Sequence, residues 1–163
     1  MLVVGFITLV LVSLVVALQV LALLLISDHL PRFPFRHLFK VTLGLIGVIS
    51  AHVVSIVIFG CVTYALTHVD KQRFGRLESE GPQTMNDYIY FSFTTYTTVG
   101  YGDYTPKGPI RLLSQIEALV GLVLIACSAS YIFIIMQDYW RAHTRVLRRT
   151  ADHKDKRFED PRR

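Results

Sequence analysis

The stretch that decides the fold is "TTYTTVGYGD", residues 94–103, which lies between two long apolar runs. Threonine, glycine and aspartate ordinarily mark turns on a protein surface. The segment before it carries Thr84 and Asp87 three residues apart, ahead of an apolar run, a spacing typical of a helix start. This spacing predicts a helix from Met85 to about Thr97, ~20 Å long at 1.5 Å per residue. Such a helix is too short to cross a membrane, so we expect the chain to enter the membrane, stop and return.

The surrounding sequence indicates a membrane protein. The chain of 163 residues is 52% apolar, and its charged residues leave three long gaps, one of which holds Glu117 alone. An uncharged stretch of about 20 residues can cross a hydrocarbon core roughly 30 Å thick. We therefore predict three transmembrane helices, near 2–27, 41–67 and 112–137. The first lacks the basic start and the cleavage site of a secretory signal, so we expect it to be retained.

The return segment is "TVGYGD", residues 98–103. Non-helical backbone at membrane depth is tolerated where it is buried in protein or lines a water-filled path, which leaves two interpretations. Gly100 and Gly102 can adopt positive φ, so the strip from Thr98 to Tyr101 can alternate its handedness and point successive carbonyls the same way. Several such strips around an axis would stack rings of carbonyl oxygens that replace the water shell of a cation. The residue types therefore favour a pore lining.

Neighbouring side chains fit a pore lining as well. The Thr98 hydroxyl would add an inner ring of oxygens, and Tyr101 would point outward and pack on Tyr90 and Phe91 of the short helix. That helix would aim its carbonyl end, with a partial charge of about −0.5, at the centre of the pore. Asp103 would place a carboxylate at the outer mouth. A phosphate-binding glycine loop would need a preceding strand and a following helix rich in N–H donors, which this sequence pattern lacks.

Residues Thr97 to Asp103 resemble the signature sequence of the potassium channel pore-loop superfamily, TVGYG, and the resemblance extends over roughly 41–137. The chain is also similar to small prokaryotic potassium-channel-like proteins with an extra leading helix, through "EALVG" at 117–121. It departs from the family in its pore helix, where "YFSF" stands in place of paired tryptophans and a threonine in place of a glutamate. The resemblance implies K⁺ sites at Thr98, Val99, Gly100 and Tyr101, supported by Thr97, Gly102, Asp103, Tyr90, Phe91 and Thr94.

The sequence thus predicts an all-α integral membrane protein with three transmembrane helices, a re-entrant pore helix and a selectivity-filter loop. Its parts would be a leading helix with a basic linker (1–40), a pore domain (41–137) and a basic tail (138–163) that continues the third helix and then frays. The polar segment 68–83 contains glycine and proline breakers and is predicted to be an exposed loop. Each chain has one filter signature, whereas a ring of carbonyls needs four, so we expect a homotetramer.

The expected function is passive, potassium-selective conduction, without enzymatic activity, an organic cofactor or a nucleic-acid partner. Two alternatives remain open: a non-selective cation pore, which usually lacks an intact TVGYG, and a non-conducting regulatory subunit of another channel. No predicted span carries the regularly spaced arginines of a voltage sensor. The tail is also too short for a ligand-binding domain of ordinary size.

The distribution of basic residues predicts the orientation of the chain. The linker 28–40 holds three basic residues against one acidic residue, and the tail from 138 holds nine against five, whereas 68–111 holds five of each. Lysine and arginine accumulate on the cytoplasmic side of membrane proteins. We therefore expect the amino terminus to lie outside the cell and the carboxyl terminus in the cytoplasm, and the resemblance implies that the membrane is a prokaryotic cell membrane. Anionic lipid would attract the tail by about 1 kcal/mol per nearby cation.

Three residues inside the predicted spans invite a functional interpretation. Glu117 and His52 lie at similar depths, so they could meet behind the filter as a proton-sensitive brace, or Glu117 could pair with a pore-helix hydroxyl such as Thr94. The alternative is a glutamate that only fixes packing. Gly121 lies where the inner helix of the family often carries a hinge glycine, and close packing of a small residue is the competing interpretation.

Overall fold

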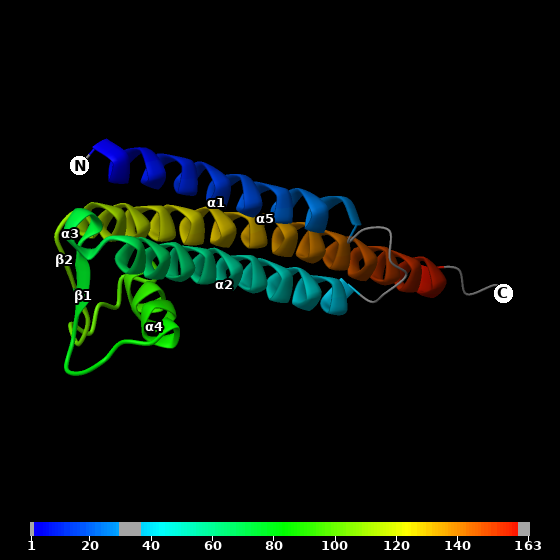
Figure 1. Cartoon of the computed structure of the whole chain (residues 1–163). Coiled ribbons are helices and arrows are strands. Elements are labelled where there is room, and N and C mark those ends of the chain that lie inside the picture. Colours follow the sequence, from blue (N-terminus) through cyan, green and yellow to red (C-terminus); the bar gives the residue numbers. More distant parts are fainter. Residues whose placement is uncertain (1, 30–36, 160–163) are drawn as a thin grey trace.

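The chain is described by a computed structural model that covers residues 2–29 and 37–159. Within these residues the helices are α1 (Leu2–His29), α2 (His37–Val69), α3 (Lys71–Phe74), α4 (Met85–Tyr96) and α5 (Ile110–Glu159). The strands are β1 (Arg76–Glu78) and β2 (Thr105–Lys107), as Figure 1 shows. The predicted pore helix, from Met85 to about Thr97, therefore agrees with α4.

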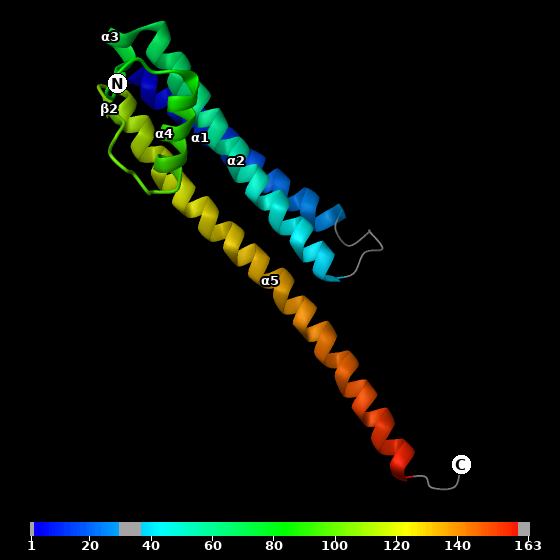
Figure 2. The ribbon, with the colours of Figure 1, turned by 90° about the horizontal axis from the view of Figure 1, so that it is seen from below.

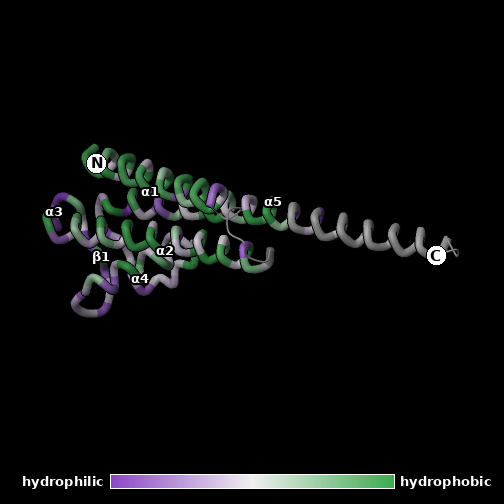
Figure 3. Tube along the Cα trace, turned by 90° about the vertical axis from the view of Figure 1, so that its right-hand side faces the viewer, coloured by the Kyte–Doolittle hydropathy of each residue, from purple (hydrophilic) through white to green (hydrophobic). Residues whose placement is uncertain are grey.

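Within residues 2–29 and 37–159, three helices are long and apolar enough to cross a membrane, over Leu2–His29, Phe39–Val69 and Ile110–Gln137. The three predicted spans, 2–27, 41–67 and 112–137, are thus confirmed, and each of their ends lies within two residues of the observed apolar helix. Figure 3 shows that apolar residues cover these helices, while polar residues gather around α3, β1 and the loop beside them. A helix that is apolar on all sides is typical of a membrane span.

The three long helices lie side by side, and α1 packs against both α2 and α5 (Figures 1 and 2). Lipid is as apolar as leucine, so van der Waals packing and hydrogen bonds between helices hold such a bundle together. The buried contacts come from every long helix and from the end of α4: Val4, Leu11 and Val15 from α1; Ile56 and Phe59 from α2; Tyr96 from α4; Ile110, Leu113 and Leu124 from α5.

Helix α4 lies against α2 and α5 at one end of the bundle, as Figure 2 shows. A Cβ atom on Gly60 of α2 would lie 2.9 Å from the Cα atom of Ile89, so this glycine lets the backbone of α4 approach α2 closely. At the end of α4 the ring of Tyr96 is fully buried and lies 6.4 Å from the ring of Phe59. The short helix is therefore wedged between the second and third spans.

The segment 68–83 differs from the predicted exposed loop. The Asp70 carboxylate accepts hydrogen bonds from the backbone N–H groups of Gln72 and Arg73, at 3.0 and 2.9 Å, and so caps α3. Strand β1 pairs antiparallel with β2, with Leu77 opposite Pro106. The loop prediction was wrong here because β2 lies beyond the filter, so no local pattern around Leu77 marks it as a strand.

Helix α5 is 50 residues long, which corresponds to ~75 Å at 1.5 Å per residue. It extends well past the ends of α1 and α2 (Figure 2). Most of the predicted tail is therefore helical, and the predicted fraying does not occur before Glu159. The linker residues 30–36 and the final residues 160–163 lie outside the described residues, so they carry no structural account.

Candidate functional site

The start of α4 is held by the carboxylate of Asp87. The backbone N–H and the hydroxyl of Thr84 donate to one oxygen of this carboxylate, at 2.6 and 2.8 Å. The hydroxyl of Tyr104, which follows the filter, donates to the other oxygen at 2.8 Å. The hydrogen bonds from the Thr84 backbone and the Tyr104 hydroxyl hold the pKa of the carboxyl below its usual range. Asp87 thus joins the segments on either side of the pore loop.

Acidification is expected to loosen this junction. Because the pKa of Asp87 is lowered from 3.8 in the folded chain, its hydrogen bonds contribute stability above about pH 4 and lose it as the pH falls further. We expect Asp87→Asn to lower the thermal midpoint by a few degrees at neutral pH and to flatten its decline toward about pH 3. Melting curves in detergent would measure both effects. Glu80→Gln, which removes an exposed carboxylate from the preceding loop, is the control, and equal curves for the two variants would contradict the expectation.

The end of α4 passes directly into the filter segment through backbone hydrogen bonds. The N–H of Thr97 donates to the carbonyl of Phe93 at 3.1 Å, and the N–H of Thr98 donates to the carbonyl of Thr95 at 3.0 Å. The N–H of Gly100 then returns to the carbonyl of Thr94, also at 3.0 Å. The last turn of the pore helix therefore sets the position at which the filter backbone begins.

The backbone of the filter segment alternates in handedness. Positive φ occurs at Thr98 (60°), Gly100 (53°) and Gly102 (85°), whereas Val99 and Tyr101 are absent from the positive-φ residues of the described chain. Positive φ is rare for a residue with a Cβ atom and is adopted readily by glycine. The positive φ expected at the two glycines is present, and Thr98 extends the alternation by one residue. Peptide units that alternate in this way can turn successive carbonyls toward one side.

Two side chains of the filter segment, residues 98–103, are exposed to solvent when one chain is considered by itself. Tyr101 is 72% exposed and Val99 is 54% exposed. The rings on which Tyr101 was predicted to pack have other neighbours: Tyr90 meets Tyr104 edge-on at 5.7 Å, and Phe91 is buried in a cluster with Leu77 and Tyr88. The side chains of Val99 and Tyr101 are therefore only partly covered within the described part of one chain.

The structure does not bring Glu117 and His52 together. Glu117 is fully buried on α5, and neither of its carboxyl oxygens has a hydrogen-bond partner among the described residues. The buried Ser92 hydroxyl of the adjoining α4 interacts with this carboxyl, although without the geometry of a hydrogen bond. The predicted alternative, Thr94, donates instead to the carbonyl of Phe91 in its own helix, at 2.9 Å.

His52 belongs to a different polar cluster, which joins four helices. Its Nδ1 atom lies 3.0 Å from the Tyr96 hydroxyl of α4, and its Nε2 atom lies 3.0 Å from the Ser128 hydroxyl of α5. Gln19 of α1 completes the cluster. The sequence analysis identified His52 but missed Gln19, although Gln19 is the one amide side chain in the first helix.

Gly121 lies in the middle of α5, buried against the end of the pore helix. A Cβ atom built on it would overlap the carbonyl oxygen of Tyr96 and lie 2.9 Å from the carbonyl carbon of the same residue. The α5 helix continues through this position without interruption. The geometry therefore gives Gly121 a close-packing role, and the hinge remains a prediction.

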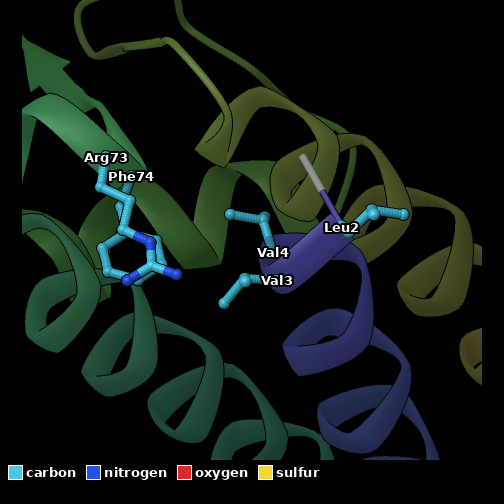
Figure 4. A pocket seen from close by; sticks show the side chains of 5 residues that line it. All are labelled: Leu2, Val3, Val4, Arg73 and Phe74. Carbon is cyan, nitrogen blue, oxygen red and sulfur yellow. The ribbon is translucent and has the colours of Figure 1, made fainter.

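A separate pocket lies where α1 begins, near α3. It is lined by Leu2, Val3, Val4, Arg73 and Phe74 (Figure 4). The Arg73 guanidinium carbon lies 5.7 Å from the centre of the Phe74 ring. This cation–π contact stabilises the charged side chain next to the apolar residues of the pocket. None of its lining residues belongs to the filter segment.

Three helices able to cross a membrane, with a short helix and an irregular loop between the second and the third, define a multi-pass, pore-loop membrane protein. Residues 51–138, more than half of the chain, match the protein family described as "Ion channel". The chain belongs to this ion channel family.

Comparison with curated proteins gives one relative in particular. The inward rectifier potassium channel Kirbac3.1 of Paramagnetospirillum magnetotacticum is 38% identical over 58 residues. These residues are 35% of this chain and only 20% of that channel, so the chain matches a small part of its relative. No solved structure gives a significant match. The two sequence matches confirm the resemblance to potassium channel pore-loop proteins.

Proposed function

We propose that four copies of this chain surround an axis and conduct K⁺ passively and selectively across a membrane. The ion sites would be formed by backbone carbonyls of Thr98, Val99, Gly100 and Tyr101, with the Thr98 hydroxyl as a further ligand. Carbonyl and hydroxyl oxygens would replace the water shell of each ion, and repulsion between ions at adjacent sites would move them through.

The observation that carries this proposal is the alternating sign of φ from Thr98 to Gly102. An ordinary helix turns all its carbonyls along the axis, and an ordinary strand turns them to alternate sides. A strip of alternating handedness can direct them to one side, where several strips would enclose a cation. The family membership and the relative named above as a potassium channel support the choice of an ion, and of K⁺ in particular.

The exposure of apolar side chains supports assembly. Val99, Tyr101 and, on α5, Leu122 are each more than half exposed, and Tyr90 and Phe93 on α4 are exposed to a lesser degree. A filter at membrane depth must be surrounded by protein, and each chain contributes only one strip. A ring of identical copies would meet both needs, and closed rotational symmetry is the usual arrangement for such copies.

The charge distribution supports an orientation with the amino terminus outside and the basic tail in the cytoplasm. In that orientation the filter would lie toward the outer side, because α4 adjoins the end of the bundle opposite the tail (Figure 1). The basic residues of the tail would then lie where anionic lipid is concentrated.

Reconstitution of the full chain into liposomes tests the proposal. A K⁺ gradient is expected to drive ion flux that a fluorescent reporter detects, and replacing K⁺ by Na⁺ is expected to reduce this flux by at least about a hundredfold, consistent with a filter built for the larger ion. The mass of the purified protein in a membrane mimetic should equal four chains. Equal flux of both ions would indicate a non-selective cation pore, and an assembled protein without flux would indicate a non-conducting subunit; either result would overturn the proposal.

A further inference from the structure

The first helix carries a buried amide that reaches the other spans. The side chain of Gln19 is 1% exposed, and its Nε2 atom donates to the Ser128 hydroxyl of α5 at 3.0 Å. The same Nε2 atom lies 3.3 Å from Nε2 of His52 on α2. An amide inside a membrane helix is costly unless it finds partners, and here both partners lie on other helices.

The hydrogen bonds continue from His52 to the end of the pore helix. Its Nδ1 atom lies 3.0 Å from the hydroxyl of Tyr96, and the two rings meet edge-on with centres 5.9 Å apart. Tyr96 is fully buried and is the last residue of α4, so Thr97 and the filter follow at once. Its carbonyl abuts Gly121 at the other side. Tyr96 is therefore held at both ends, by its hydroxyl and by its backbone.

The donors and acceptors of this cluster fix the state of the imidazole. The Gln19 amide nitrogen can only donate, and it lies 3.3 Å from Nε2 of His52 as well as 3.0 Å from the Ser128 oxygen. Nε2 therefore faces a donor, and the Ser128 hydroxyl, 3.0 Å away, can donate to it as well. A ring nitrogen that accepts must be unprotonated. The geometry thus favours a neutral His52 whose hydrogen resides on Nδ1 and is donated to the Tyr96 oxygen.

We propose that Gln19 is a positioning residue for the filter. Gln19 acts on Tyr96 through Ser128 and His52, so the first helix contributes to the geometry of the pore. The proposal rests on the function proposed above. The filter strip begins at Thr98, two residues after Tyr96, and backbone hydrogen bonds from Thr98 and Gly100 connect it to the last turn of α4. A shift of the Tyr96 ring would therefore move the point from which the carbonyl strip starts.

The amide oxygen of Gln19 allows a positioning role to be distinguished from simple stabilisation of the fold. Its Oε1 oxygen is buried and has no hydrogen-bond partner among the described residues. A buried unsatisfied carbonyl is unfavourable, so an apolar side chain of similar shape should be tolerated at this position. Gln19→Leu is therefore expected to keep or raise the thermal stability while it impairs conduction. If Gln19 only stabilised the fold, Gln19→Leu would lower both the thermal stability and the conduction.

The test uses the full chain in liposomes, with K⁺ flux normalised to assembled protein. Gln19→Leu is expected to lower K⁺ flux about three- to tenfold, the factor that one hydrogen bond represents. Thr8→Val is the matched control, because Thr8 is equally buried on α1 but donates only to the Val4 carbonyl of its own helix. Tyr96→Phe should lower flux to a similar extent, and the double variant should be little worse than either single one, because both changes break the same chain of contacts.

A spectroscopic measurement tests the cluster without relying on conduction. Nitrogen NMR of ¹⁵N-histidine in the reconstituted wild-type chain should show His52 with hydrogen on Nδ1 alone, assigned among the six histidines by its loss in His52→Gln. Gln19→Leu should give a mixture of the two tautomers, because Nε2 then no longer faces the amide donor and the Ser128 hydroxyl can either donate to it or accept from it.

The outcomes separate the two proposals. Wild-type protein without K⁺ flux would defeat the proposed function, and the NMR signature would still decide whether Gln19 sets the state of His52. If the wild type conducts and the Gln19→Leu and Thr8→Val variants have equal K⁺ flux, the positioning role is overturned. A wild-type His52 that carries its hydrogen on Nε2 would also overturn it. Should Gln19→Leu fail to assemble, Ser128→Ala removes the contact that Gln19 makes with α5 and is expected to show the same loss of flux.

Discussion

Replacing Gly100 by alanine is expected to abolish K⁺ flux. Gly100 has φ of 53°, in the left-handed region, where a residue with a Cβ atom costs about 1–2 kcal/mol. In a ring of four identical strips the strain would total about 4–8 kcal/mol if each chain keeps its conformation. Since 1.4 kcal/mol is a factor of ten, we expect flux to fall more than about a hundredfold. The flux assay in liposomes measures this loss directly.

Gly81→Ala is the matched control for this substitution. Gly81 also has positive φ, at 108°, and a Cβ atom added there would meet nothing within 4 Å. It lies in the exposed segment between β1 and α4, so an alanine strains the backbone without touching the filter. We expect its flux to remain within about twofold of the wild type, because surface substitutions usually have small effects. A similar loss in both variants would show that strain anywhere in the chain suffices, and would remove the special role assigned to Gly100.

Replacing Gly121 by alanine is the second change with a large expected effect. The added Cβ atom would overlap the Tyr96 carbonyl oxygen, so α4 and α5 must separate or the end of the pore helix must shift. Overpacking of this kind typically costs about 1–3 kcal/mol per chain. Both the thermal midpoint of the assembled protein and its K⁺ flux should fall. A hinge role alone would leave the thermal midpoint unchanged.

Replacing Gly5 by alanine should not lower the thermal midpoint. Gly5 is also inside a helix, and a Cβ atom there would meet nothing within 4 Å. Alanine is favoured over glycine within a helix by roughly 0.5–1 kcal/mol, because glycine loses more conformational freedom on folding. Gly5→Ala should therefore leave the thermal midpoint equal or higher and the flux unchanged. If both glycine variants lost stability alike, the contact between Gly121 and Tyr96 would not be the cause.

Several features were predictable because the information for them is local. The three spans follow from uncharged stretches, and the pore helix follows from Thr84 and Asp87, whose side chains meet in the structure as that spacing predicts. Positive φ at Gly100 and Gly102 follows from the residue type. The β1–β2 pair was not predicted, because a strand of three residues has no recognisable local pattern and is formed by pairing with a segment far away in the sequence.

The sequence by itself determined that the chain is a membrane protein of three spans with a glycine-bearing loop, since hydrophobic length, charge and backbone freedom act over a few neighbouring residues. Only the tertiary structure decided that His52 meets Tyr96, Ser128 and Gln19 rather than Glu117. The physical reason is that a membrane helix is apolar around its whole circumference, so its sequence does not specify which side faces a neighbour. Depth along the helix is readable from residue number, whereas rotation about its axis is set by the packing of side chains from all the helices together.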